Sequence, residues 1–148
     1  MQSNRTPALL LIAALLACGC TSLADRDQAA VRQLVDRFVR SVNEANTENF
    51  VQCFAPDATA FFPSPANAMR RTGRDAIRVA VAPAFAAGSP AARVEPRDLT
   101  IDVEGDAALV TFDAGSGTRH ARRTLVLRRS QGQWLITHLH ASNVDEAR

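Results

Sequence analysis

The sequence predicts an α+β domain in which helices lie on one side of an antiparallel sheet. Three observations point to this fold class. The length of 148 residues suits one domain, and 47% hydrophobic residues supply one packed core. Apolar residues recur at helical spacing in the first half of the chain. Short runs rich in β-branched residues, punctuated by turn residues, fill the second half.

The first half is typical of helices. Apolar residues at three- and four-residue spacing predict a helix from Asp27 to Ala45, with an acidic cap at Asp25. We expect a short second helix to begin near Asn46-Thr47 and to stop at Pro56. The segment Gly73-Arg74-Asp75 then opens a third helix.

The remaining segments predict strands. Two short strands are expected at Ala58–Pro63 and Met69–Thr72. Four longer strands follow, and the short separators between them, Gln131-Gly132 among them, join antiparallel neighbours. The four expected ranges are Arg93–Glu104, Ala107–Ala114, Thr118–Arg129 and Gln133–Ser142. One domain therefore spans residues 25–144.

Residues 1–20 predict an export signal. Arg5 precedes the apolar run Ala8–Ala17, which is too short to cross a bilayer core about 30 Å thick. The segment Leu15-Leu16-Ala17-Cys18-Gly19-Cys20 resembles a bacterial lipoprotein signal. In such signals a small residue precedes a Cys, the chain is cleaved at this Cys, and the Cys is lipidated. Cys18 and Cys20 both fit, and an ordinary cleaved signal or a membrane-associated segment are the alternatives.

Neither candidate Cys is followed by Asp, the residue that in Gram-negative lipoproteins favours retention at the inner membrane. For a Gram-negative source, the resemblance therefore implies a lipid anchor on the periplasmic face of the outer membrane.

Three segments carry a second resemblance. They are Phe54–Thr59 after the helical hairpin, Gly73–Ile77 at the third helix, and Trp134–Ser142 at the end of the last hairpin. The chain resembles nuclear transport factor 2-like (SnoaL-like) domains, which implies a cystatin-like cone, made by a curved antiparallel sheet wrapped around about three N-terminal helices. The last segment is also similar to the association domain of calcium/calmodulin-dependent kinases. The superfamily hosts enzymes, transport factors and assembly domains, so the fold alone does not give the function.

The last hairpin carries the candidate site. If its loop has two residues, the pairing places Leu125 opposite His138 and Arg123 opposite His140. These side chains would share one sheet face with Trp134, which we take as the face toward the helices. A one-residue change in the loop would exchange the two faces.

His138 and His140 are candidate catalytic residues, because imidazole transfers protons near neutral pH. They could instead be a structural pair, or they could bind an anion together with Arg123, whose guanidinium offers two parallel donors to a carboxylate. No acid or Cys is placed as the third ligand that a catalytic zinc site needs, so we expect no metal and no cofactor. Phe62 is expected to line the pocket.

Two function classes are disfavoured. The ketosteroid isomerases of this superfamily use an Asp base just before a Pro in the first strand, together with a Tyr donor. Phe62 occupies that base position, and the chain contains no Tyr. The formal net charge of +2 is too small for a nucleic-acid-binding domain.

The leading hypothesis is an exported, lipid-anchored domain that binds a small, mostly apolar molecule, with a carboxylate facing Arg123 and His140. Phe62, Trp134 and Leu125 would contribute the apolar lining. The second hypothesis is an isomerase-, dehydratase- or cyclase-like enzyme with His138 or His140 as general base. The third is a non-catalytic assembly domain, and we expect a homodimer.

Overall fold

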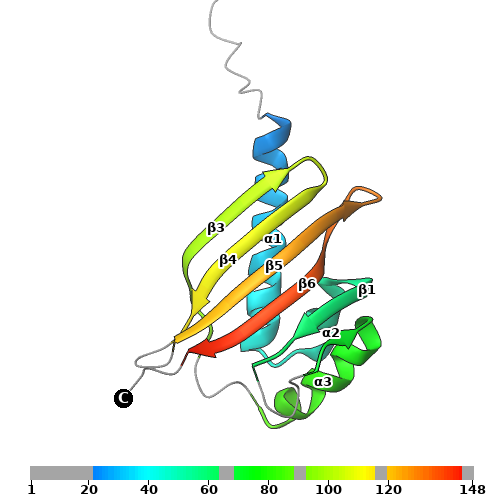
Figure 1. Ribbon diagram of the computed structural model, residues 1–148, viewed down its shortest axis with the longest axis vertical. Coiled ribbons are helices and arrows are strands. Elements are labelled where there is room, and N and C mark those ends of the chain that lie inside the picture. Colours follow the sequence, from blue (N-terminus) through cyan, green and yellow to red (C-terminus); the bar gives the residue numbers. More distant parts are fainter. Residues whose placement is uncertain (1–21, 64–68, 89–92, 116–119, 145–148) are drawn as a thin grey trace, which may run out of the picture.

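The computed structural model describes residues 22–63, 69–88, 93–115 and 120–144. The predicted signal and the lipidation site at Cys18 or Cys20 therefore lie outside the described residues. Helices gather on one side of a single sheet (Figure 1). The elements are α1 (Leu23–Asn43), α2 (Thr47–Gln52), β1 (Phe54–Phe61), β2 (Arg71–Thr72), α3 (Arg74–Ala86), β3 (Pro96–Glu104), β4 (Ala107–Ala114), β5 (His120–Ser130) and β6 (Gln133–Val144).

Helix α1 begins earlier than the apolar spacing predicts. The Ser22 side chain accepts a hydrogen bond from the backbone N–H of Asp25, and the Asp25 carboxylate accepts one from the backbone N–H of Ser22. This reciprocal capping satisfies two donors that a helix start leaves unpaired. The predicted acidic cap is therefore wrong, because Asp25 is the third helical residue and Ser22 is the cap. Among the helices in these ranges, none has the length and apolar character needed to span a membrane.

Asn46 caps α2 as expected, but the helix ends before Phe54, so its predicted extent to Pro56 is wrong. The chain enters the sheet here instead. The Ile136 N–H donates to the Cys53 carbonyl at 2.9 Å, and Phe54 pairs with Ile136 in β6. This long-range pairing overrides the local helical pattern.

The strand order is β2-β1-β6-β5-β4-β3. Strand β6, the last in the sequence, lies between β1 and β5, where it pairs parallel with β1 and antiparallel with β5. All other neighbours are antiparallel. Helix α1 crosses behind β3 to β6, while α2 and α3 lie beside β1 (Figure 1). We call the sheet face toward the helices the inner face and the opposite face the outer face.

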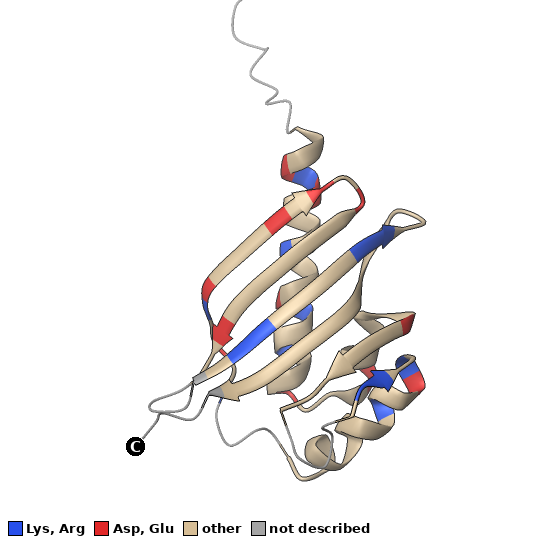
Figure 2. Ribbon diagram, in the orientation of Figure 1, with Lys and Arg blue, Asp and Glu red and all other residues tan. Residues whose placement is uncertain are grey.

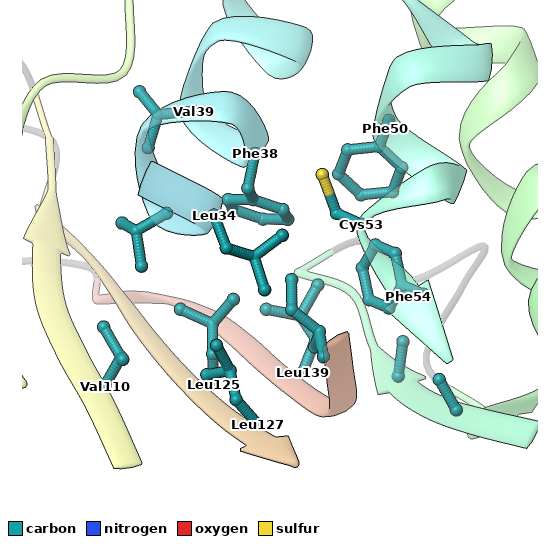
Figure 3. Packing of buried hydrophobic residues seen from close by; sticks show 14 of the residues in the cluster. Leu34, Phe38, Val39, Phe50, Cys53, Phe54, Val110, Leu125, Leu127 and Leu139 are labelled. Carbon is teal, nitrogen blue, oxygen red and sulfur yellow. The ribbon is translucent and has the colours of Figure 1, made fainter. Parts of the chain in front are cut away.

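The core fills the space between the helices and the inner face. Leu34 and Phe38 of α1 point toward Leu125 of β5 and Leu139 of β6 (Figure 3). Each of these four side chains is buried, and Leu125 has no exposed surface. The ring of Phe38 also packs against Phe50 of α2, with centroids 5.2 Å apart.

Polar contacts fix the N-terminal end of α1 to the sheet. The Asp27 carboxylate accepts hydrogen bonds from Arg129 at 2.5 Å and from the indole N–H of Trp134 at 3.4 Å. Arg129 also pairs with Asp106 at 2.7 Å. The β3–β4 and β5–β6 turns therefore lie at the N-terminal end of α1, which we call the narrow end.

The C-terminal end of α1 is fixed separately. The Asn43 side chain donates to the Val94 carbonyl at 2.9 Å and accepts from the Val94 N–H at 2.7 Å. Val94 leads into β3, so the start of that strand lies at this end. The end of β4 and the start of β5 lie beside it, and we call this end of the molecule the wide end.

Candidate functional site

The predicted pairing of the last hairpin holds only near its turn. Ser130 pairs with Gln133 across a two-residue loop, and the predicted Arg129–Trp134 and Leu127–Ile136 pairs are confirmed. The next register position then skips Thr137.

Thr137 is an extra residue in β6, a β-bulge, so His138 pairs with Val126 and His140 pairs with Thr124. The predicted Leu125–His138 and Arg123–His140 pairs are therefore wrong. The Thr137 hydroxyl donates to the Val126 carbonyl at 3.1 Å.

The bulge separates residues that were expected to share one face. On the inner face, Leu125 pairs with Leu139, and Arg123 pairs with Ala141. Beyond Thr137, His138 and His140 occupy the outer face. The expected site that joined Arg123 to both imidazoles is therefore not formed.

Arg123 lies on the inner face at the wide end, between Phe112 of β4 and Ala141 of β6. Its guanidinium Nη1 donates to the backbone carbonyls of Arg122 at 2.9 Å and Ser142 at 3.2 Å. Burial lowers the pKa of Arg123, which reflects the cost of removing its charge from water. Within the part of the chain that the structure describes, Arg123 forms no ion pair with a carboxylate.

Small and aromatic residues occur at this end of the inner face. Ala114, Ala121 and Ala141 are buried at the wide end of the inner face, on β4, β5 and β6. Phe62 and Phe85 are half-buried and pack against the same core. Residues 64–68, 89–92 and 116–119 lie outside the described residues.

The other predicted lining residues do not converge on Arg123. Leu125 is a fully buried core residue. Trp134 lies at the narrow end, where the Arg129 guanidinium stands 5.5 Å from the centre of its ring. Because Arg129 and Arg123 are six residues apart on β5, Trp134 is about 20 Å from Arg123 along the strand. Phe62 is thus the predicted aromatic residue closest in the fold to the wide end.

A second group of side chains lies on the outer face. The Thr59 hydroxyl and the His138 Nδ1 are 2.7 Å apart. The Phe61 ring lies 6.0 Å from the His138 ring and 5.9 Å from the His140 ring, centre to centre. Parallel pairing places Thr59 beside His138 and Phe61 beside His140. Thr59 and Phe61 were not predicted as site residues, because no local pattern in the sequence reveals pairing between strands so far apart along the chain.

Burial is the main reason that the pKa of His138 is lowered, and the nearby His140 and Arg70 lower it further. The ring is therefore neutral at pH 7 and can accept a proton. Across the described residues, no three His, Cys, Asp or Glu side chains come together as metal ligands would.

Two surface hollows of about 330 and 310 Å³ lie elsewhere. The first borders Trp134 near the narrow end, and the second borders the last turns of α1. Neither is lined by Arg123, His138 or His140. These two hollows therefore belong to neither group of candidate side chains.

Comparison with known proteins agrees with this architecture. Residues 31–146 match the family described as a SnoaL-like domain. An NTF2-like protein of unknown function from Pseudomonas putida superposes with a TM-score of 0.70 at 25% identity, covering 79% of this chain and 86% of the other. No curated protein matches the sequence.

Two further structures are similar in fold. A Streptomyces avermitilis protein of the NTF2-like family, provisionally named a dehydratase, gives a TM-score of 0.68 at 20% identity over 81% of this chain and 97% of its own. An NTF2-like protein with a cystatin-like fold from Novosphingobium aromaticivorans gives a TM-score of 0.65 at 18% identity, covering 87% of this chain and 94% of its own. The cone-shaped α+β fold expected from the sequence is thereby confirmed.

Proposed function

Because the chain belongs to the SnoaL-like domain family, we propose that it is an exported, lipid-anchored domain that binds a small molecule at the wide end of its inner face. This molecule is mostly apolar and carries one anionic group. Arg123 supplies the positive charge that meets the anionic group. Phe62 and the neighbouring alanines supply apolar surface. The lipid attaches at Cys18 or Cys20.

One observation carries this proposal: Arg123 is a largely buried cation whose hydrogen bonds go to carbonyls rather than to a carboxylate. A buried charge without a counter-charge is costly, so a ligand carboxylate would gain from two parallel guanidinium donors. Since Nη1 already donates to Arg122 and Ser142, the Nε and Nη2 groups are the donors that such a ligand would use. The anionic group is therefore best taken as a carboxylate bound by one edge of the guanidinium.

The apolar part of the ligand follows from the neighbours of Arg123. Phe112 and Ala141 flank it on the adjacent strands, and buried alanines continue the inner face toward the wide end. Ligand sites commonly combine an apolar lining with a few polar groups that fix orientation.

The positions of the two histidines do not support the catalytic hypothesis. It placed His138 or His140 inside the cone as a general base, whereas both lie on the outer face. The dehydratase description of the Streptomyces neighbour belongs to a protein only 20% identical and adds no residue role here. We therefore favour binding over catalysis.

The test of the proposal compares two adjacent arginines. Naphthalene-2-carboxylate should bind the wild-type protein more tightly than naphthalene-2-carboxamide does, measured by isothermal titration calorimetry. Arg123→Gln should weaken carboxylate binding about tenfold to a hundredfold, because hydrogen bonds to charged groups contribute roughly 1.5–3 kcal/mol.

Arg122→Gln is the matched control. Arg122 is the preceding residue and is exposed on the opposite face, so its substitution should leave the affinity unchanged. Equal affinity of the wild-type and Arg123→Gln proteins for the carboxylate would contradict the role of Arg123.

A second role, self-assembly, is favoured by the outer face. Helices cover only the inner face in the described part of the chain (Figure 1). The outer face is therefore available to a second copy, and we propose a homodimer formed through this face.

A further inference from the structure

Helix α1 begins almost directly after the proposed lipid anchor. Its cap is Ser22 and its first residue is Leu23, so two residues separate the helix from Cys20 and four separate it from Cys18. An extended chain advances at most about 3.5 Å per residue. The helix therefore starts within roughly 10 Å of an acylated Cys20, or roughly 18 Å of an acylated Cys18.

The N-terminal end of α1 lies at the narrow end of the domain. Asp27, one turn into the helix, holds Arg129 and Trp134, and Arg129 also holds Asp106. The first turn projects beyond the sheet (Figure 1). Leu23 is 77% exposed there, and an apolar side chain of this kind suits a lipid surface.

The wide end lies at the other end of α1. The helix contains 21 residues, which corresponds to about 31 Å. Asn43 holds Val94 at its far end, beside the strand ends that carry Arg123. A tether this short therefore brings the narrow end near the bilayer, and the wide end lies about one helix length from the narrow end.

We propose that the narrow end rests on the bilayer, with α1 rising from it and the wide end opening to the aqueous compartment. This orientation rests on the lipid anchor of the proposed function. It has a consequence for the ligand: the anion reaches Arg123 from water, so it is a soluble carboxylate and not a lipid drawn from the membrane. Both acidic and basic residues lie at the narrow end (Figure 2), so the lipid rather than surface charge provides the attachment. Asp25 and Arg26 are in the first turns of α1, and Asp106 pairs with Arg129.

Two exposed arginines on α1 allow a matched measurement of this orientation. Arg26 and Arg40 are 14 residues apart, which places them about 21 Å apart along the helix. Each is replaced by Trp in a Trp134→Phe background, which removes the single natural Trp. The acylated full-length proteins are incorporated into phosphatidylcholine vesicles that carry dansyl-labelled headgroups, and energy transfer from Trp to dansyl is recorded.

We expect strong transfer from the Arg26→Trp protein and transfer several times weaker from the Arg40→Trp protein. The wild-type protein, with Trp134 tied to Asp27, should resemble the first. Equal transfer from both positions would mean that the domain lies on its side, and stronger transfer from Arg40→Trp would mean that the wide end faces the lipid. Either result overturns the proposed orientation.

Vesicle flotation separates this inference from the anchor on which it rests. The wild-type protein should float with the vesicles, whereas the Cys18→Ser, Cys20→Ser double variant should not. A wild-type protein that does not float contradicts the anchor and the orientation together. A protein that floats and shows equal transfer contradicts the orientation alone.

Discussion

His138 is held in the outer face by its contact with the Thr59 hydroxyl and by burial beside Phe61. Burial and the nearby His140 and Arg70 lower its pKa below the usual 6.5. In the unfolded chain the ring regains the usual value, so the unfolded state takes up the proton first as the pH falls. The contribution of His138 to stability is therefore complete above pH 6.5 and is lost as the pH falls through the folded-state pKa.

The first prediction is that His138→Gln reduces the acid sensitivity of the fold. The midpoint of urea unfolding of the wild-type protein should fall between pH 7.5 and pH 5, and that of the variant should fall less. His140→Gln serves as the control because this ring is exposed on the same strand and face. The unfolding midpoint of the His140→Gln protein should fall almost as much between pH 7.5 and pH 5 as that of the wild type. If the midpoints of the wild-type and His138→Gln proteins fall by the same amount, the assignment to His138 is refuted.

At the level of the element, one residue in β6 decides which side chains face the helices. Before Thr137, the inner-face residues are Trp134 and Ile136, and after it they are Leu139 and Ala141. Because strand side chains alternate with a period of two, one extra residue exchanges the faces of everything that follows.

The second prediction concerns deletion of Thr137. The deletion should restore the regular register and drive His138 and His140 toward the core while Leu139 moves outward. Removing a core leucine alone costs about 2–5 kcal/mol, and burying imidazoles adds to that cost. Urea unfolding should therefore show a loss of several kcal/mol or no folded protein.

Thr137→Ala distinguishes the extra residue from its side chain. This variant keeps the bulge and loses only the hydrogen bond from the hydroxyl to the Val126 carbonyl. It should be destabilised by about 1 kcal/mol. Deletion and substitution variants of equal stability would show that the bulge does not set the register.

The sequence predicts the elements well because their signals are local. The spacing of apolar residues in α1, the turn at Gln131-Gly132 and the bounds of β4 all follow from neighbouring residues, and the structure has them. The prediction of which β6 side chains point toward the helices is wrong, because it depends on the single added residue Thr137. A signal was present: Thr137 and His138 are two consecutive polar residues where a regular strand would alternate.

The parallel pairing of β1 with β6 has no such signal. It joins Thr59 to His138 across 79 residues and is set by how the whole sheet closes on the helices. The outer-face cluster therefore emerges only from the fold.

The whole molecule has one sheet face covered by helices and another that is open. The register places an acidic row, Asp102 and Glu104, on the outer face of β3 and a basic row, Arg122 and Arg128, on the outer face of β5, while Asp113 of β4 lies beside Arg122. Near the β3–β4 turn, the uncharged Ala107 and Leu109 of β4 lie between these rows, and Leu109 is 43% exposed. This pattern is complementary to itself, as a two-fold interface requires.

We therefore predict a homodimer in which the outer faces pack together, with the acidic row on β3 of one copy opposite the basic row on β5 of the other. Val126, half-buried at the centre of this face, would be covered by the partner. Val126→Asp should give a monomer in light scattering, because it places an unpaired charge in the interface. Gln33→Asp, on an exposed position of α1, should leave the dimer intact.

The charged rows also make association of the two copies weaker in high salt, since screening acts most on exposed pairs. A wild-type protein that is monomeric at micromolar concentration and low salt would exclude this interface.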